Sequence, residues 1–437
     1  MLCRNSLGWN MRSTREVAVR LVEQVFQGGA YSNLLLNKCL REQNFSDLDR
    51  KFLTELVYGT VKACGTLDWY LAQVVTQPLS KLETLILADL RVALFQILYM
   101  DKVPAAVAVD EAVKVAKSVA NFGAAQLVNG VLRNFLRRQE EFQLPDKEAD
   151  RLALTLWHPK ELVKKWLKYY GSEATQTLCE FNNSPAPVCL RTNTLKLTRE
   201  DLGAKLQNLG VDFEFSKIAQ EGLVCKNIPS LQQMLQTCAG DFYIQDESSM
   251  LVAPLLAPKP SDKVLDLCSA PGGKTTHLAQ LMQNQGRIVA CDIHPHRLQL
   301  IEENAKNLGI SIIETRLNDG MVRNEDFVGA FDKVLVDAPC SGLGVLRRRA
   351  EARWRKKRAD LKSFPPLQSA ILAQACEYVQ AGGVMVYSTC TIEQSENHYV
   401  VEKFLTEHQD FSLVSEKQLL PHIDGVDGFY LAKLVKK

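Results

Sequence analysis

The second half of the chain alternates short apolar segments with amphipathic ones, and no other feature of the sequence constrains the fold as strongly. The apolar segments are rich in Val, Ile and Leu and lie at 263–268, 287–293, 310–317, 331–338 and 382–389. Between most of them, apolar residues recur at helical spacing, at 275–283, 296–309 and 367–380. This pattern is typical of βαβ units, in which helices cover both faces of a parallel sheet. We therefore predict an α/β domain over 242–437, with the last run, 427–437, entering the sheet antiparallel.

Two further parts precede this domain. Residues 13–141 repeat apolar side chains at spacings of three and four almost throughout, which predicts an all-α bundle over 1–141. A polar stretch at 141–150 indicates a linker. Residues 151–241 mix helical segments with short strand-like ones, which predicts a small α+β insert. The chain is thus expected to be multidomain, with domains at 1–141, 151–241 and 242–437.

The composition limits where such a chain can work. Hydrophobic residues make up 46% and charged residues 23% of the 437 residues, which excludes disorder as the main state. No uninterrupted apolar run of about 18 residues is present, and Met1–Asn10 lacks the apolar core of a signal peptide. We expect Met1–Asn10 to be poorly ordered, and Met11 offers a second start. The twelve cysteines form no C-x-x-C pair and no cluster with zinc-ligand spacing, so we expect free thiols, no metal site and a cytoplasmic protein with no membrane segment.

One basic segment contrasts with a nearly neutral chain. Residues 346–362 contain nine Lys or Arg and two acidic residues, whereas the whole chain has a net charge of +2. A focused positive charge predicts contact with a polyanion, and Trp354 within the segment is suited to stack on a base. A solvated helix face is the alternative explanation.

A glycine-rich turn follows the first strand of the predicted α/β domain. It lies within residues 264–280, VLDLCSAPGGKTTHLAQ, at the edge of the sheet where ligands bind. A P-loop is excluded because Cys268 stands where that motif needs its first glycine, and the dinucleotide pattern G-x-G-x-x-G is absent. Such a turn lets backbone amides approach a small anionic ligand closely. Packing of the helix on the strand is the alternative explanation.

Two acidic residues follow the next two strands. Asp292 lies nineteen residues after Gly273, at the end of the second strand, where a carboxylate can accept both hydroxyls of a ribose. A carboxylate at this place disfavours a ribose that carries a phosphate. Asp319 follows the third strand and is placed to contact an adenine. Together with the glycine turn, these residues predict a site for an adenosine-bearing cofactor.

Two cysteines lie at the same predicted edge. Cys340 follows the strand at 331–338, and Cys390 follows the strand at 382–389. Most cysteines are inert core residues, which is how we interpret Cys291 and Cys376. Two thiols at the ligand-binding edge of one sheet instead favour nucleophilic catalysis, in which the thiolate is the reactive form.

Three motifs at this edge carry a specific resemblance. They are CSAPGGK at 268–274, DAPCSG at 337–342 and STCT at 388–391. They resemble the signature motifs of RNA cytosine-5 methyltransferases of the Nol1/Nop2/Sun family, as do LRTNT at 190–194 and YIQDESS at 243–249. The segments at 103–117 and 127–136 resemble the NusB family of RNA-binding antitermination factors. The basic segment differs at Arg349-Ala350, where Asn-Pro is expected.

The resemblance implies a fold and a reaction. It implies a NusB-like bundle, the α+β insert and a Rossmann-like class I methyltransferase domain, with S-adenosylmethionine as cofactor and 16S ribosomal RNA, free or in an early particle, as partner. It implies that Cys390 attacks carbon 6 of a cytidine, that Cys340 assists release, and that Asp337 and Lys274 polarise the pyrimidine. The residues implied to bind the cofactor or frame the base are Cys268, Ser269, Ala270, Pro271, Gly272, Gly273, Lys274, Asp292, Asp319 and Asp337. A transfer RNA cytosine-5 methyltransferase and a non-catalytic RNA-binding transcription factor are the alternatives.

Overall fold

The computed structural model describes residues 13–356 and 358–437, so the expectations for Met1–Asn10 and Met11 lie outside the described residues. The chain forms two compact units. One consists of Met1–Ser184 and Leu346–Arg355, the other of Pro185–Val345 and Lys356–Lys437. Within the described ranges, no helix has both the length and the apolar character that a membrane span requires.

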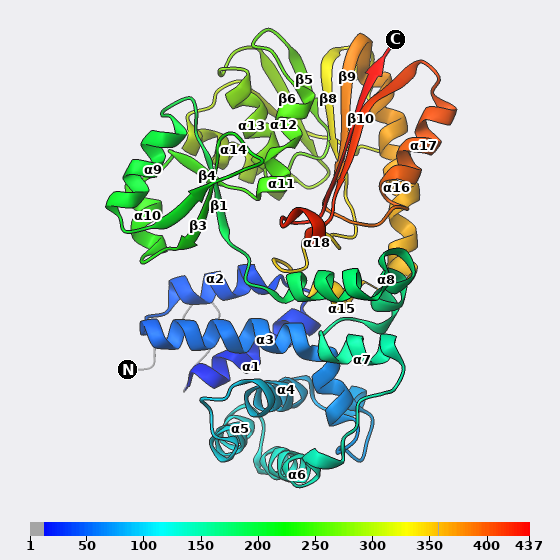
Figure 1. Cartoon of the computed structure of the whole chain (residues 1–437). Coiled ribbons are helices and arrows are strands. Elements are labelled where there is room, and N and C mark those ends of the chain that lie inside the picture. Colours follow the sequence, from blue (N-terminus) through cyan, green and yellow to red (C-terminus); the bar gives the residue numbers. More distant parts are fainter. Residues whose placement is uncertain (1–12, 357) are drawn as a thin grey trace. The chain divides into compact units, whose positions relative to one another are not determined.

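The first unit is helical (Figure 1, blue to teal, with α15 from later in the chain). Its helices are α1 (Thr14–Gln27), α2 (Ser32–Glu42), α3 (Asp47–Leu71), α4 (Thr84–Tyr99), α5 (Ala105–Val119), α6 (Phe122–Arg138), α7 (Glu148–Thr155), α8 (Lys160–Asn183) and α15 (Ala352–Arg355), with single turns η1 (Leu79–Lys81) and η2 (Gln139–Glu141). Ser13, Ser46 and Asn121 begin α1, α3 and α6, where each side chain accepts a hydrogen bond from a backbone N–H of the first turn. The apolar faces of α1 and α3–α6 form one core, as their spacing predicts.

The basic segment predicted to hold RNA is partly built into this core. Ala350 is fully buried among the core residues of α1 and α3–α6. The Arg353 guanidinium is 1% exposed and donates to the carbonyl oxygens of Trp157 and Asn182 at 2.8 and 3.2 Å. Arg355 donates to the carbonyl oxygens of Val25, Gly29 and Ala30, at the end of α1. These arginines therefore neutralise the negative ends of helices instead of facing a polyanion.

The interpretation of Trp354 as a base-stacking residue is also wrong. Its indole N–H donates to the carbonyl oxygen of Val61 at 2.7 Å. A Cβ atom on Gly65 would lie 2.5 Å from the Trp354 ring, so the missing side chain of Gly65 makes room for the indole. The sequence pattern could not reveal this because the partners lie nearly 300 positions away.

The second unit contains two sheets. Its strands are β1 (Val188–Thr192), β2 (Asp212–Phe215), β3 (Gly222–Asn227), β4 (Phe242–Ile244), β5 (Lys263–Asp266), β6 (Arg287–Asp292), β7 (Ile313–Leu317), β8 (Phe331–Asp337), β9 (Val379–Thr389), β10 (Phe411–Leu419) and β11 (Phe429–Lys436). Its helices are α9 (Arg199–Asn208), α10 (Leu231–Thr237), α11 (Glu247–Met250), α12 (Val252–Leu256), α13 (Gly273–Leu281), α14 (Pro295–Leu308), α16 (Arg358–Tyr378), α17 (His398–Glu407) and α18 (Pro421–Asp424), with the turn η3 (Glu325–Phe327).

The smaller sheet is antiparallel, in the order β2-β3-β1-β4, and packs against α9 and α10 (Figure 1). The larger sheet has the order β10-β11-β9-β8-β5-β6-β7. Strands β5 to β9 are parallel, and β11 lies antiparallel between β9 and β10. Core residues of α16 and α17 cover one face, and those of α12, α13 and α14 cover the other. The predicted doubly covered α/β domain and its antiparallel last strand are therefore confirmed.

Some elements differ from the prediction. Within the predicted insert, the first long helix, α8, runs to Asn183 with a kink at Gly171, where φ is 79°. The predicted insert at 151–241 spans both units, because α8 belongs to the first and the small sheet to the second. Strand β10 was not expected, since most of its residues are exposed and, among the described strands, it pairs with β11 alone.

Candidate active site

The glycine turn lies where the connectivity of the larger sheet reverses. From β5 the chain proceeds outward to β6 and β7, and then returns to the other side of β5 to form β8 and β9. A crevice opens at the carboxyl ends of the strands at such a reversal, and ligands of open α/β sheets bind there. The turn between β5 and α13 and the end of β8 thus flank the predicted site.

Close packing explains why the turn needs glycine. Gly272 has φ 99°, which side-chain-bearing residues rarely adopt. A Cβ atom on Gly273 would lie 3.0 Å from the Tyr243 ring. The turn is held by the backbone N–H of Ser269, which donates to the carbonyl oxygen of Cys291 at 2.8 Å, and by that of Gly272, which donates to Ser269. The backbone N–H groups at the start of α13 lie beside this turn.

A cavity of about 180 Å³ opens at the turn. Seven of the residues predicted to bind a cofactor line it: Cys268, Ser269, Ala270, Pro271, Gly273, Lys274 and Asp337. The others in its lining were not predicted: Tyr243, Ile244, Gln245, Ser249 and Asp266. Gly272, Asp292 and Asp319 are not among the lining residues.

Asp292 nevertheless lies next to the turn. It ends β6, directly after Cys291, and its side chain is 5% exposed. Its carboxylate accepts a hydrogen bond from the backbone N–H of His294 at 3.0 Å and pairs with Arg297 at 3.2 Å. Arg297 also donates to the carbonyl oxygen of Ala270 in the turn. Asp319 accepts from the backbone N–H of Met321 at 2.9 Å, beyond the end of β7.

Asp266 supplies a buried carboxyl group to the wall of the cavity. It is fully buried, and its Oδ2 accepts from the Thr275 hydroxyl at 2.7 Å, while Oδ1 has no partner among the described residues. Burial raises the pKa of Asp266 to about 7, and the nearby charge of Asp337 adds to the rise. Burial also raises the pKa of Cys268 well above its usual value, so Cys268 is no nucleophile.

Lys274 and Asp337 form an ion pair at the edge of the cavity. The Lys274 Nζ lies 2.6 Å from Asp337 Oδ2, and Ser388 donates to Asp337 Oδ1 at 2.8 Å. Burial by itself would lower the pKa of Lys274, but the attraction of Asp337 outweighs it, so the pKa is raised and the amine keeps its charge. The structure therefore brings together the two residues predicted to polarise the pyrimidine.

The two predicted catalytic cysteines lie side by side. Their Sγ atoms are 3.3 Å apart, although 50 residues separate them in the sequence. The hydrogen bond to Cys390 and burial together raise the pKa of Cys340 well above its usual value. Cys340 therefore remains a neutral thiol that can share its proton with Cys390. The cysteines interpreted as inert, Cys291 and Cys376, are buried in the core, as expected.

A buried polar cluster supports the loops that carry the two thiols. The Glu396 carboxylate accepts from the backbone N–H of Ser341 at 2.8 Å and from the Gln368 side chain at 3.0 Å. The hydroxyl groups of Ser341 and Thr391 lie 2.7 Å apart, which ties the residue after Cys340 to the residue after Cys390. Gln368 also donates to the carbonyl oxygen of Pro339. Sequence patterns missed Glu396 and Gln368, because nothing local distinguishes them from surface residues of helical segments.

Comparison with known proteins identifies the families that this chain resembles. The chain matches three families: 16S rRNA methyltransferase RsmB/F over residues 253–435, NusB over 12–137 and the RsmF/B-like ferredoxin-like domain over 158–231. The "Probable ribosomal RNA small subunit methyltransferase B" of Bacillus subtilis is 38% identical, over 97% of this chain and 99% of the relative. The chain belongs to the ribosomal RNA small subunit methyltransferase B family.

Solved structures agree with this membership. The crystal structure of PH0851 has a TM-score of 0.87 at 26% identity and covers 98% of this chain and 99% of its own. NSun6 from Pyrococcus horikoshii, solved with SFG, has a TM-score of 0.57 at 25% identity and covers 64% of this chain and 98% of its own. The chain joins a NusB helical domain and a small α/β middle part to a Rossmann-like methyltransferase domain with a mixed sheet. The predicted fold class is thereby confirmed.

Proposed function

We propose that this protein transfers a methyl group from S-adenosylmethionine to carbon 5 of a cytidine in 16S ribosomal RNA, through a covalent bond between Cys390 and carbon 6. The observation that carries the proposal is the pair of thiols 3.3 Å apart, in the same unit as the glycine-turn cavity. Family membership supports methylation of small-subunit ribosomal RNA. We place this reaction in the cytoplasm, where ribosomal RNA would be methylated free or in an early particle.

The residues around the cavity fit this cofactor. Backbone N–H groups at the start of α13 suit a carboxylate group, and the carboxylate of Asp292 suits the hydroxyls of a ribose. The carboxylate of Asp337, which is paired with Lys274, supplies negative charge for an ammonium or sulfonium group. The cofactor supplies an electrophilic methyl group on a positively charged sulfur.

The cytosine ring must be activated before it can accept that methyl group. Addition of the Cys390 sulfur to carbon 6 breaks the aromaticity of the ring and makes carbon 5 nucleophilic. Because Cys340 keeps its own proton, it can donate a hydrogen bond to a Cys390 thiolate and stabilise that form. The charge of Lys274 acts in the same direction, since Lys274 and Cys390 interact electrostatically.

The ring also needs a partner that withdraws electrons from carbon 6. The Lys274–Asp337 pair is suited to this role, because the Lys274 amine can donate to the carbonyl oxygen of the ring while Asp337 holds Lys274 in place. After methylation, the proton on carbon 5 must pass to a base, and the electron pair it leaves restores the ring double bond as the Sγ–C6 bond breaks. We assign Cys340 to this release step: its thiol gives its proton to the Cys390 sulfur as the Sγ–C6 bond breaks, and the Cys340 thiolate so formed takes up the proton from carbon 5.

Trapping the covalent adduct tests the proposal. Cys390→Ala should form no adduct and show no methyl transfer, because the nucleophile is absent. In Cys340→Ala, Cys390 should still attack carbon 6 and the cytidine should still be methylated, but the RNA should be released slowly. A methylated protein–RNA adduct should therefore accumulate and survive denaturing electrophoresis. Methyl groups are followed with radiolabelled S-adenosylmethionine, and bisulfite sequencing of the RNA reports methylation at carbon 5.

Three outcomes would contradict parts of this proposal. An adduct in Cys390→Ala that is absent from Cys340→Ala would reverse the roles of the cysteines. Methylation of transfer RNA in preference to 16S ribosomal RNA would change the substrate. A wild-type protein that binds RNA but transfers no methyl group would favour the non-catalytic alternative.

A further inference from the structure

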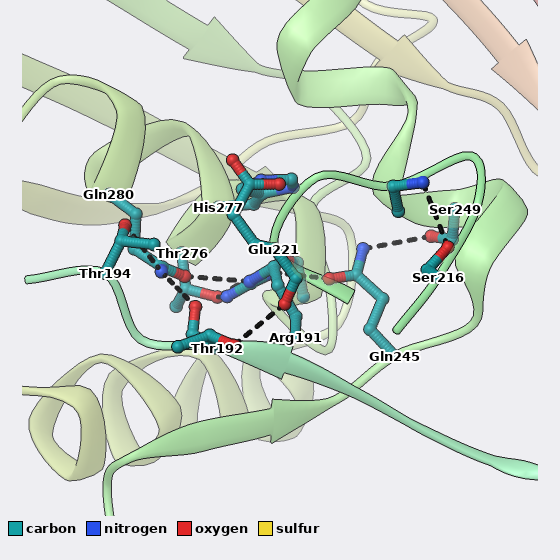
Figure 2. A network of polar contacts seen from close by, with 12 residues as sticks. Arg191, Thr192, Thr194, Ser216, Glu221, Gln245, Ser249, Thr276, His277 and Gln280 are labelled. Atoms are coloured by element: carbon teal, nitrogen blue, oxygen red, sulfur yellow. Dashed lines mark hydrogen bonds and ion pairs between the residues drawn. The ribbon is translucent and has the colours of Figure 1, made fainter. Parts of the chain in front are cut away.

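A fully buried arginine connects the small sheet to the glycine turn. Arg191 lies on β1, and its guanidinium group has no exposed surface. Its Nε donates to Gln280 Oε1 at 2.8 Å and its Nη2 to Thr276 Oγ1 at 2.9 Å, both on α13. Its Nη1 donates to the carbonyl oxygen of Gly273. The same nitrogen donates to Gln245 Oε1 (Figure 2). One side chain therefore contacts the start of α13 and its last turn.

The same guanidinium contacts the opposite wall of the cavity. It lies over the ring of Tyr243, 5.2 Å from the centroid, and this ring is the one that closely approaches Gly273. Gln245, which Arg191 also holds, donates in turn to the Ser249 hydroxyl (Figure 2). Tyr243, Gln245, Ser249 and Gly273 all line the cavity, so Arg191 contacts three of its lining residues directly and the fourth, Ser249, through Gln245.

The chemistry of the contacts explains why this position holds arginine. The group donates to four acceptors, and the rigid fork of a guanidinium can reach all of them at once. A lysine amine has three donors on a single nitrogen and cannot span the same set. Burial lowers the pKa of Arg191 to about 9, so the group remains charged at neutral pH. All four acceptors are neutral oxygens, so none of them cancels the positive charge of Arg191 beside the cavity.

We propose that Arg191 is a positioning residue for the cofactor: it holds the glycine turn, the start of α13 and Tyr243 in the arrangement that binds S-adenosylmethionine. Through Arg191 on β1, the small sheet would then help to shape the cofactor site. This inference rests on the proposed function for the identity of the ligand, but not for the arrangement of the turn.

Arg191→Lys tests the inference because it keeps the charge and removes the fork. The affinity for S-adenosylmethionine, measured by titration calorimetry, should fall roughly tenfold or more, since small displacements of binding groups have effects of this size. The loss should appear mainly as a higher KM for the cofactor. In the cofactor-free protein, amide hydrogens over 268–276 should exchange faster than in the wild type. Thr276→Val removes one acceptor and should give a smaller change in the same direction.

A matched control separates positioning from general destabilisation. Leu206→Ala truncates a fully buried residue in the core of the same small sheet, away from the Arg191 contacts. It should lower the melting temperature while leaving cofactor affinity and exchange over 268–276 at wild-type values. Equal cofactor affinity in Arg191→Lys and wild type, or an equal loss in Leu206→Ala, would overturn the inference.

The exchange measurement keeps the two proposals distinguishable. If wild type bound no S-adenosylmethionine, the proposed function would fail, yet exchange over 268–276 would still decide whether Arg191 orders the turn. Unchanged exchange in both Arg191→Lys and Thr276→Val would overturn the inference whatever the ligand is.

Discussion

At the scale of single residues, burial gives neighbouring groups around the cavity different protonation states. Burial raises the pKa of Asp266 to about 7, while the attraction of Asp337 keeps Lys274 charged. The hydrogen bond to Cys390 and burial keep Cys340 neutral. Groups whose environments separate their pKa values in this way are suited to hold and move protons in a reaction.

The raised pKa of Asp266 predicts how the free energy of unfolding depends on pH. Its pKa is about 7 in the folded protein and near 3.8 in an unfolded chain, so folding favours the protonated form. The stabilising contribution is present below pH 3.8 and is lost as the pH rises through 7. Relative to Asp266→Asn, the free energy of unfolding of the wild type should therefore fall between pH 5 and 7, by up to about 1.4 kcal/mol per pH unit. Urea unfolding of both proteins at each pH measures this difference, and a constant difference would contradict it.

The sequence predicted some of these residues and could not predict others. Cys340, Cys390 and Asp337 follow apolar runs, and the end of a strand places a side chain at the ligand-binding edge. Arg191 was visible only as part of a strand-like run, because its role depends on acceptors 54 to 89 positions away. Asp266 lies within an apolar run, and its sequence neighbours gave no indication that its carboxyl group would line the cavity.

At the scale of elements, the sequence predicted those helices and strands whose apolar residues form the cores. The helices of the first unit have apolar residues at helical spacing on their buried faces, and the strands β5 to β9 are short apolar runs within the buried sheet. The short helices α10, α11 and α12 lack enough turns to show a period. The segment 346–355 has the composition of an RNA-binding surface, but its Arg353 and Arg355 bind carbonyl oxygens at helix ends.

The contact between Gly65 and Trp354 gives an element-scale prediction. Gly65→Ala places a Cβ atom within 2.5 Å of the indole, so it should lower the free energy of unfolding by about 1–3 kcal/mol through overpacking. Gly130→Ala is the matched control: it lies in α6, where a Cβ atom would meet nothing within 4 Å. There alanine should stabilise the helix by up to about 1 kcal/mol. Changes of the same sign in thermal or urea unfolding would contradict the assigned role of Gly65.

At the scale of the whole molecule, the helical unit is discontinuous in sequence. Its core includes Ala350, and Trp157 packs edge-on against Tyr99 with ring centroids 5.0 Å apart. The Thr66 hydroxyl donates to the carbonyl oxygen of Leu154 at 2.7 Å. A fragment that ends at residue 141 would lack all three contacts. The helical unit therefore extends beyond the predicted domain at 1–141, to residues 142–184 and 346–355.

A fragment experiment tests this wider extent of the helical unit. Residues 1–184 alone should unfold at a lower temperature than the helical unit of the intact chain, because the site for 346–355 is open. A synthetic peptide of residues 346–355 added in trans should bind and raise the melting temperature, as any ligand of the folded state does. The same peptide with Arg353→Ala should bind more weakly, since it loses the contacts with Trp157, Asn182 and Asn183. A fragment that melts like the intact unit, with no response to peptide, would contradict the assignment of 346–355 to the core.

The late position of 346–355 also has a consequence for synthesis on the ribosome. The eight longer helices of the unit are made first, but residues 185–345 must be translated before the last piece of its core exists. At roughly 5–20 residues per second, this interval lasts roughly 10 to 30 seconds, whereas helical bundles fold in microseconds to milliseconds. Until then, the groups that 346–355 will contact, such as the carbonyl oxygens of Val25 in α1 and Val61 in α3, lack these partners. During that time, chaperones or a peptide that resembles residues 346–355 could bind at the unfilled site.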